Sequence, residues 1–115
     1  MDAETRRVDA RALAPGQTAK LQLRPRGGGS VEGFVVDDAG SVLAYVNACP
    51  HAGNPLDLRA PGFYSEDGRH LVCSVHGAVF APDTGVCTEG PCPGARLDPL
   101  TVTRDGDAFV ISCPT

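Results

Sequence analysis

The chain has 115 residues, a length that suits one domain with a modest core. Its net charge of −4 gives no electrostatic basis for binding nucleic acid or an anionic membrane surface, and it favours a basic protein partner. Glycine and proline, with 14 and 10 residues, favour short strands joined by tight turns. We therefore expect a single domain over residues 1–115 that contains no long helix.

The N-terminal segment MDAETRRVDARALAPG lacks the apolar core of a signal peptide, and the chain has no run of 18 apolar residues. These features predict a cytoplasmic protein that does not enter a membrane. Because cytosolic thiols stay reduced, the five cysteines favour metal binding over a disulfide framework.

Six segments alternate apolar and polar residues between turn residues, which is typical of β-strands. In chain order they are 18–24, 31–38, 41–48, 70–74, 100–104 and 108–112. The polar turns DDAG (37–40) and RDGD (104–107) are expected to close two hairpins, and RPRGGGS (24–30) is expected to join two strands. No stretch of twelve residues has a helical apolar period, so the predicted fold class is all-β.

Two pairs of cysteine and histidine lie on glycine-containing turns. Cys49 and His51 form a C-x-H pair in NACPHAGNPLD, and Cys73 and His76 form a C-x-x-H pair in CSVHG. Four such ligands from two loops suit either one tetrahedral zinc or a two-iron cluster with mixed ligation, and the spacing alone does not decide. Glycines beside both pairs let backbone N–H groups come close enough to bond to bridging sulfides.

The segments CPHAGNPLD and CSVHGAVFAPDTGVCTEGPCPGARL resemble the two cluster-binding loops and the following proline loop of Rieske 2Fe-2S proteins, in particular the small soluble ferredoxin-like branch. The similarity covers about residues 31–112. It implies a Rieske-like antiparallel β-sandwich with a cluster-binding subdomain of two loops, at about residues 47–95, and one 2Fe-2S cluster per chain. It also implies that each iron has two ligands from the chain: Cys49 with Cys73 on one iron, and His51 with His76 on the other.

The same resemblance implies a low reduction potential within the family. High-potential members join the two loops by a disulfide, and Asn54 and Val75 stand at those cysteine positions here. Those members also carry Gly-Ser-x-Tyr after the second histidine, with hydroxyls that donate to sulfur, whereas this chain has Gly-Ala-Val-Phe at 77–80. Because this chain has neither the disulfide nor the two hydroxyls, its reduction potential is expected in the lower part of the Rieske range of about −150 to +300 mV.

The remaining cysteines and the third histidine have simpler interpretations. Cys87 and Cys92 flank TEGP. They are either small, partly buried residues of the loop that covers the cluster or a redox-sensitive disulfide clasp, which requires Cα atoms within about 7 Å. Cys113 is expected to pack as a small apolar side chain. His70 is expected at a strand end or on the surface.

The segment between His51 and Cys73 is longer than in compact ferredoxin-like members. Phe63 and Tyr64 within it are interpreted as caps of the core, and docking of a partner is the alternative.

The ligands that remain limit the function. A Rieske oxygenase subunit needs a second iron site with two histidines and a carboxylate, and only His70 is spare, so the chain is not expected to be an oxygenase by itself. A nucleotide-binding reductase would require G-x-G-x-x-G after a strand, and the sequence has no such motif. We predict an electron-transfer protein rather than an enzyme, a monomer that shuttles single electrons from a reductase to a terminal oxygenase or oxidase. One alternative is a redox-sensing or fixed Rieske subunit of a larger oxidoreductase. Another is a zinc-stabilised interaction module, which would be colourless and would unfold with chelators.

Overall fold

The computed structural model describes residues 5–9, 18–24, 28–38, 41–50, 53–57, 63–65, 69–75, 77–91 and 93–113. Within these residues the regular structure consists of nine strands, and neighbouring strands pair antiparallel. The strands are β1 (Thr5–Asp9), β2 (Thr18–Leu23), β3 (Val31–Asp38), β4 (Ser41–Val46), β5 (Leu71–Val72), β6 (Val79–Phe80), β7 (Cys87–Glu89), β8 (Pro99–Asp105) and β9 (Ala108–Ser112). The predicted all-β antiparallel class is confirmed. The described segments include no helix with the length and hydropathy that a membrane span requires.

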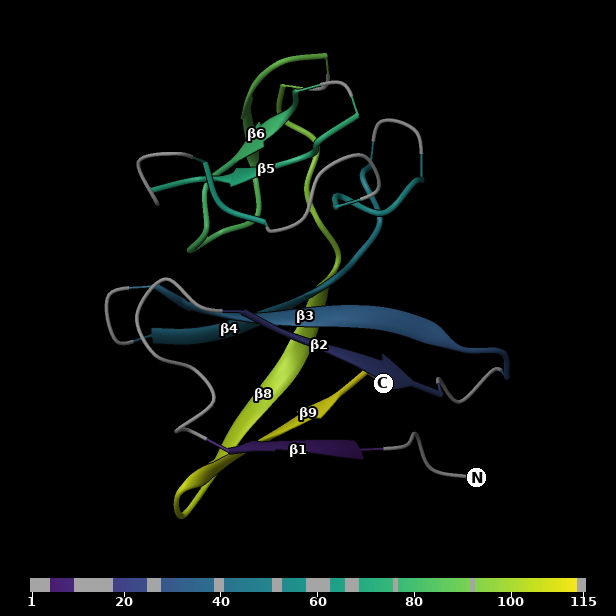
Figure 1. Cartoon of the computed structure of the whole chain (residues 1–115), viewed down its shortest axis with the longest axis vertical. Coiled ribbons are helices and arrows are strands. Elements are labelled where there is room, and N and C mark those ends of the chain that lie inside the picture. The colour runs from purple at the N-terminus through teal and green to yellow at the C-terminus, as the bar shows by residue number, and fades with distance from the viewer. Residues whose placement is uncertain are drawn as a thin grey trace. The chain divides into compact units, whose positions relative to one another are not determined.

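The chain divides into two compact units. The first unit comprises Met1–Val46 and Pro99–Thr115, and the second comprises Asn47–Asp98. The first unit contains a six-stranded sheet with the order β1-β9-β8-β4-β3-β2. Figure 1 shows β3 beside β4, and β8 and β9 as the hairpin that continues the sheet toward β1.

The core of the first unit comes from one face of these strands. Val35 of β3 lies directly opposite Ala44 of β4, and both are buried in the core. The other buried members are Leu23 (β2), Leu100 (β8) and Ile111 (β9), with Val8 of β1 and Cys113 packed against them. The prediction that Cys113 packs as a small apolar side chain is therefore confirmed.

The other face of β3 and β4 is also apolar. Phe34 lies opposite Tyr45, with a distance of 6.0 Å between ring centroids, and both residues are buried. Residues on both faces of β3 are thus removed from water, which explains why VEGFVVDD reads almost continuously apolar in its middle.

The two edge strands of the six-stranded sheet lie side by side. Arg6 Nε in β1 donates to the backbone carbonyl of Gln22 in β2, at 2.9 Å. Because β1 and β2 are the first and last strands of the sheet order, this hydrogen bond joins its two edges through a side chain.

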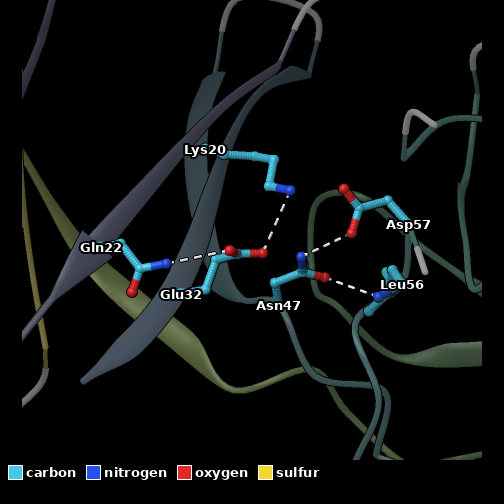
Figure 2. A network of polar contacts seen from close by, with 6 residues as sticks. All are labelled: Lys20, Gln22, Glu32, Asn47, Leu56 and Asp57. Carbon is cyan, nitrogen blue, oxygen red and sulfur yellow. Dashed lines mark hydrogen bonds and ion pairs between the residues drawn. The ribbon is translucent and has the colours of Figure 1, made fainter. Parts of the chain in front are cut away.

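Polar residues on β2 and β3 form an exposed cross-strand cluster (Figure 2). Gln22 Nε2 donates to Glu32 Oε2 at 3.2 Å, and Lys20 Nζ lies 3.5 Å from Glu32 Oε1. Gln22 and Glu32 are direct partners in the β2–β3 register. Cross-strand pairs of this kind reinforce a register, although exposed ion pairs contribute little to stability.

Both predicted hairpins are confirmed by the strand pairing, although residues 39 and 40 of the first turn lie outside the described residues. Asp38 pairs with Ser41 at the end of β3–β4, and Asp105 pairs with Ala108 at the end of β8–β9. Gly106 adopts a φ of 61° in the second turn, a conformation that glycine adopts without strain. The predicted connection at 24–30 joins β2 to β3, which pair with each other.

The second unit has a three-stranded sheet with the order β5-β6-β7. Figure 1 shows β5 and β6 side by side in this unit. The buried apolar residues of the unit include Leu56, Phe63, Leu71, Phe80 and Leu97. Of these residues, Leu71 and Phe80 belong to the small sheet itself, on β5 and β6.

Candidate metal centre

The first predicted ligand, Cys49, begins a hairpin loop three residues after β4. Its N–H donates to the carbonyl of Asn54 at 2.7 Å, and its carbonyl accepts from the N–H of Gly53 at 2.6 Å. Gly53 closes this turn with a φ of 78°, which favours glycine. Cys49 has no exposed surface.

The second predicted ligand, Cys73, begins a loop with the same hydrogen bonds. Its N–H donates to the carbonyl of Ala78 at 2.9 Å, and its carbonyl accepts from the N–H of Gly77 at 3.0 Å. Gly77 has a φ of 74°. Cys73 is also fully buried. The second unit therefore presents two thiols on two loops that are closed by the same backbone hydrogen bonds.

Two hydrogen bonds connect these loops directly. Ser74 N–H donates to the carbonyl of Leu56 at 2.7 Å. Asn54 Nδ2 donates to Cys73 Sγ at 3.5 Å, a distance suited to a sulfur acceptor. Asn54 also closes the first loop through its own carbonyl, so this residue contacts both cysteines.

Asn47 fixes the end of the first loop to its beginning (Figure 2). Its Oδ1 accepts from the N–H of Leu56 at 2.8 Å, and its Nδ2 donates to Asp57 Oδ1 at 3.0 Å. Asn47 is only 5% exposed, so both amide atoms satisfy groups that have little access to water. The chain from Asn47 to Asp57 is thereby closed around Cys49.

The chain that follows β7 contacts the Cys73 loop at Gly90. Cys87 in β7 is joined to residues 94 and 95, because its N–H donates to the Ala95 carbonyl at 2.7 Å and its carbonyl accepts from Gly94 N–H at 2.9 Å. At Gly90, an added Cβ would lie 2.8 Å from Ala78 Cα. Glycine at this position therefore allows the two backbones to touch.

The structure describes two of the four predicted ligands. Cys49 and Cys73 are described and come together through Asn54, whereas His51 and His76 lie outside the described residues. Among the residues described, no three histidine, cysteine or acidic side chains form a metal site. The four-residue ligand set thus stays a prediction.

The other predicted residues are placed as follows. Cys87 is buried and its thiol donates to the carbonyl of Glu89 at 3.2 Å, while Cys92, its predicted partner in a clasp, lies outside the described residues. His70 immediately precedes β5, and its N–H donates to Ser65 Oγ at 3.2 Å, which confirms the strand-end prediction.

Phe63 and Tyr64 lie beside β5 in the second unit. Phe63 is 3% exposed and its carbonyl accepts from Val72 N–H at 2.8 Å, while Tyr64 forms a bridge with Leu71. The interpretation of Phe63 as a core residue is confirmed. A buried Phe63 offers no surface on which a partner could dock.

Sequence reasoning missed the structural roles of Asn47 and Asn54. Asn54 was noticed only as a residue in place of a disulfide cysteine. A usable signal was available, since each is a polar amide in a loop that also carries a buried ligand, and buried polar groups need partners. What the sequence did not provide was which partner each amide would find.

The described donor set fits an iron–sulfur cluster. Thiolates are the ligands that such clusters prefer, and Cys49 and Cys73 provide two thiols that are buried from water. Asn54 already directs a hydrogen-bond donor at one of these sulfurs, as the surroundings of a metal-bound thiolate commonly do. At Gly53 and Gly77, which close the two loops, an added Cβ would meet no atom within 4 Å.

Comparisons with known proteins identify this arrangement. The family model of the Rieske [2Fe-2S] domain matches residues 9–113. The structure is similar to the ferredoxin of carbazole 1,9a-dioxygenase from Nocardioides aromaticivorans IC177, with a TM-score of 0.72, 26% identity and full coverage of both chains. The fold is also that of part of the terminal oxygenase of carbazole 1,9a-dioxygenase from Novosphingobium sp. KA1, with a TM-score of 0.75, 17% identity, and coverage of 96% of this chain and 30% of that one.

A curated relative is larger. The oxidoreductase NdmD of Pseudomonas putida is 44% identical over 80 residues, which are 64% of this chain and 13% of that protein. The chain thus corresponds to a small part of this relative's length. The prediction of a 2Fe-2S cofactor is confirmed by the family. The match to a ferredoxin agrees with the predicted electron carrier. On these grounds, the chain belongs to the Rieske [2Fe-2S] domain family.

Proposed function

We propose that the chain transfers single electrons through a 2Fe-2S cluster held by four residues: Cys49 and Cys73 on one iron, and His51 and His76 on the other. The observation that carries this proposal is the pair of matching loops, each with a buried cysteine at its start and a positive-φ glycine four residues later. The histidines follow in the sequence within the same two loops. We further propose that residues 1–115 act as one Rieske domain, with the cluster-binding part at about 47–95.

When bound, a cluster with two cysteine and two histidine ligands accepts and releases one electron at about −150 to +300 mV, above the potential of clusters with four cysteines. The chain's own residues set the conditions for this chemistry. Burial of Cys49 and Cys73 excludes water from the sulfurs. The hydrogen bonds of Asn47 and Ser74 hold the two loops in place.

The outer side of the loops suits a protein partner. Pro50, Gly53 and Gly77, which are close to the two histidines in the sequence, are exposed and uncharged. None of these three positions itself presents a charged side chain to a partner. Complexes that transfer electrons have small, transient interfaces, so a few exposed positions of this kind can form such a contact.

We propose that the donor is a reductase and the acceptor a terminal oxygenase. The ferredoxin of carbazole 1,9a-dioxygenase supports this, since its full length matches the full length of this chain. The match to 13% of NdmD favours a second candidate, a Rieske part fixed within a larger oxidoreductase. The cytoplasmic location and the monomeric state stay predictions from the sequence.

Electron paramagnetic resonance before and after reduction with dithionite, with iron and sulfide measured on the same sample, tests the cluster. We expect a silent oxidised state, a rhombic signal of low average g on reduction, and roughly two irons and two sulfides per chain. Zinc in place of iron, with no signal after anaerobic purification, would establish the zinc-stabilised module instead.

The shuttle and the fixed subunit differ in how the rate depends on concentration. The purified chain can be mixed with an NADH-dependent flavoprotein reductase and with cytochrome c as the acceptor. A shuttle gives a rate of cytochrome c reduction that rises with chain concentration and then saturates. A fixed subunit gives no rate above that of the reductase alone.

A further inference from the structure

Asn54 contacts the two cysteine loops in different ways. Its backbone carbonyl accepts from the N–H of Cys49 at 2.7 Å, which closes the first loop. Its side-chain amide donates to Cys73 Sγ in the second loop, at 3.5 Å. One residue therefore joins the backbone of the first thiol loop to the sulfur of the second.

The neighbouring Pro55 fixes the orientation of this amide. Asn54 Nδ2 also donates to the carbonyl of Pro55 at 2.9 Å. A carbonyl can only accept, so the amide atom beside it must be the NH2 nitrogen rather than the oxygen. The second N–H of that nitrogen is then available for Cys73 Sγ. Proline after Asn54 also restricts the Asn54 backbone to extended conformations, which reduces the entropy lost in holding this geometry.

The contact has no counterpart at the matching position of the second loop. Asn54 is the residue whose carbonyl closes the Cys49 loop, and Ala78 is its equivalent in the Cys73 loop. The side chain of Ala78 has no donor. Ala78 therefore cannot form the side-chain contact that Asn54 forms.

We propose that Asn54 is a positioning residue for Cys73 that raises the reduction potential of the chain. The inference rests on the proposed function, in which Cys73 is a ligand of the cluster. Adding an electron increases the negative charge on the thiolate sulfurs, and a hydrogen bond to a charged acceptor is stronger than one to a neutral acceptor. The amide therefore stabilises the reduced state more than the oxidised state. Asn54 occupies the position of a disulfide cysteine in high-potential relatives, and here it provides a polar link between the loops instead.

The test compares Asn54→Leu and Asn54→Asp with the unaltered chain by redox titration of the loaded protein. Asn54→Leu keeps the approximate side-chain shape but removes the donor, and it should lower the equilibrium constant for one-electron reduction about tenfold, or about 59 mV. Asn54→Asp should lower it further, because a carboxylate near the thiolate opposes added negative charge. The control is Thr88→Val, which removes the hydrogen bond from Thr88 Oγ1 to the Val79 carbonyl and should leave the potential unchanged.

Stability and iron content are measured on each variant, because a merely structural role would change these and leave the potential unaltered. A fully loaded Asn54→Leu variant with the potential of the unaltered chain would overturn the inference while leaving the proposed function intact. Absence of iron and sulfide from the unaltered chain would instead overturn the proposed function, and this inference with it.

A second measurement needs no variant at position 54 and covers the case in which Asn54→Leu does not fold. The chain has two asparagines, Asn47 and Asn54. With 15N in asparagine side chains, pulsed electron paramagnetic resonance of the reduced protein should detect a weak nitrogen coupling, and this coupling should persist in Asn47→Asp. Absence of the coupling in the unaltered chain, or its loss in a loaded Asn47→Asp variant, would contradict the assignment to Asn54.

Discussion

Gly53 and Gly77 hold equivalent positions in the two cysteine loops. Each lies four residues after a cysteine and donates its N–H to that cysteine's carbonyl, at 2.6 and 3.0 Å, with φ angles of 78° and 74°. The two loops therefore repeat one turn although their sequences, CPHAGN and CSVHGA, share little. The different spacings of C-x-H and C-x-x-H thus reflect a histidine moved by one residue within loops of equal length.

Alanine at either glycine should destabilise its loop. Gly53→Ala and Gly77→Ala should each cost roughly 1–3 kcal/mol, because an L-residue is strained at these φ angles while no neighbour lies within 4 Å of the added Cβ. Both variants should also release iron faster on heating, as measured by visible absorbance. Gly28→Ala, with a φ of 94° and equal space, is the matched control in the β2–β3 connection. It should not change iron release, and equal iron release from all three variants would contradict the prediction.

Gly90 should tolerate alanine less well than Gly94 does. Both have positive φ angles, 100° and 87°, but a Cβ at 90 meets Ala78 Cα at 2.8 Å while a Cβ at 94 meets nothing within 4 Å. Gly90→Ala should therefore lower the free energy of unfolding by about a further 1–3 kcal/mol relative to Gly94→Ala, measured by denaturant titration. Equal losses would mean that Gly90 does not press on the Cys73 loop in solution.

The side-chain amide of Asn47 should stabilise the protein through its hydrogen bonds to Leu56 and Asp57. Asn47→Leu leaves the N–H of Leu56 without its acceptor and should cost about 1–3 kcal/mol. Asn47→Asp keeps that acceptor but sets a carboxylate against Asp57. The exchanged pair Asn47→Asp with Asp57→Asn restores a donor opposite an acceptor, so it should recover part of the loss. Additive losses in this double-mutant cycle would show that the Asn47–Asp57 bond does not contribute.

The potential of the unaltered chain should be below about +100 mV, in the lower part of the Rieske range. Ala78→Ser restores one of the two hydroxyls that high-potential relatives carry, and a donor near the sulfurs should raise the potential by about 59 mV for a tenfold change in the reduction equilibrium. Ala81→Ser, three residues further on, is the control and should leave the potential unchanged. Redox titration measures all three proteins. An unaltered chain well above +100 mV would refute the explanation based on missing hydroxyls.

Strands with clear alternation could be predicted from the sequence. VEGFVVDD matches β3 residue for residue, and the strands expected at 18–24 and 108–112 match β2 and β9 closely. Two predicted strands are shorter than expected because loop hydrogen bonds replace the ladder. β4 ends at Val46, where the Asn47 side chain begins to close the first loop, and β5 ends at Val72, where Cys73 begins the second.

Three strands were missed for physical reasons. β1, with the sequence TRRVD, is mostly exposed, so its pairing with β9 depends on backbone hydrogen bonds that leave little apolar pattern. β6 and β7 contain two and three residues, which is too short for a period to be recognised. Tertiary pairing, rather than local preference, determines all three.

The candidate site could likewise be predicted only in part from the sequence. Its cysteines were evident from spacing and resemblance, because a candidate metal ligand can be recognised from its residue type alone. The link from Asn54 to Cys73 Sγ was not, since it joins positions 19 residues apart in a geometry that the folded loops create. Likewise, nothing local in the sequence shows that Gly90 touches Ala78.

The hydrogen bond from Arg6 to Gln22 has a consequence for behaviour at high concentration. Strands at the edges of a sheet offer unpaired backbone groups to other chains, and such edges promote aggregation. Here β1 and β2 face each other, and an arginine from one takes up a carbonyl of the other. Arg6→Ala would expose that carbonyl and remove a positive charge from the edge. We therefore expect Arg6 to hinder the addition of a strand from a neighbouring molecule, and the Arg6→Ala variant to aggregate at lower protein concentration.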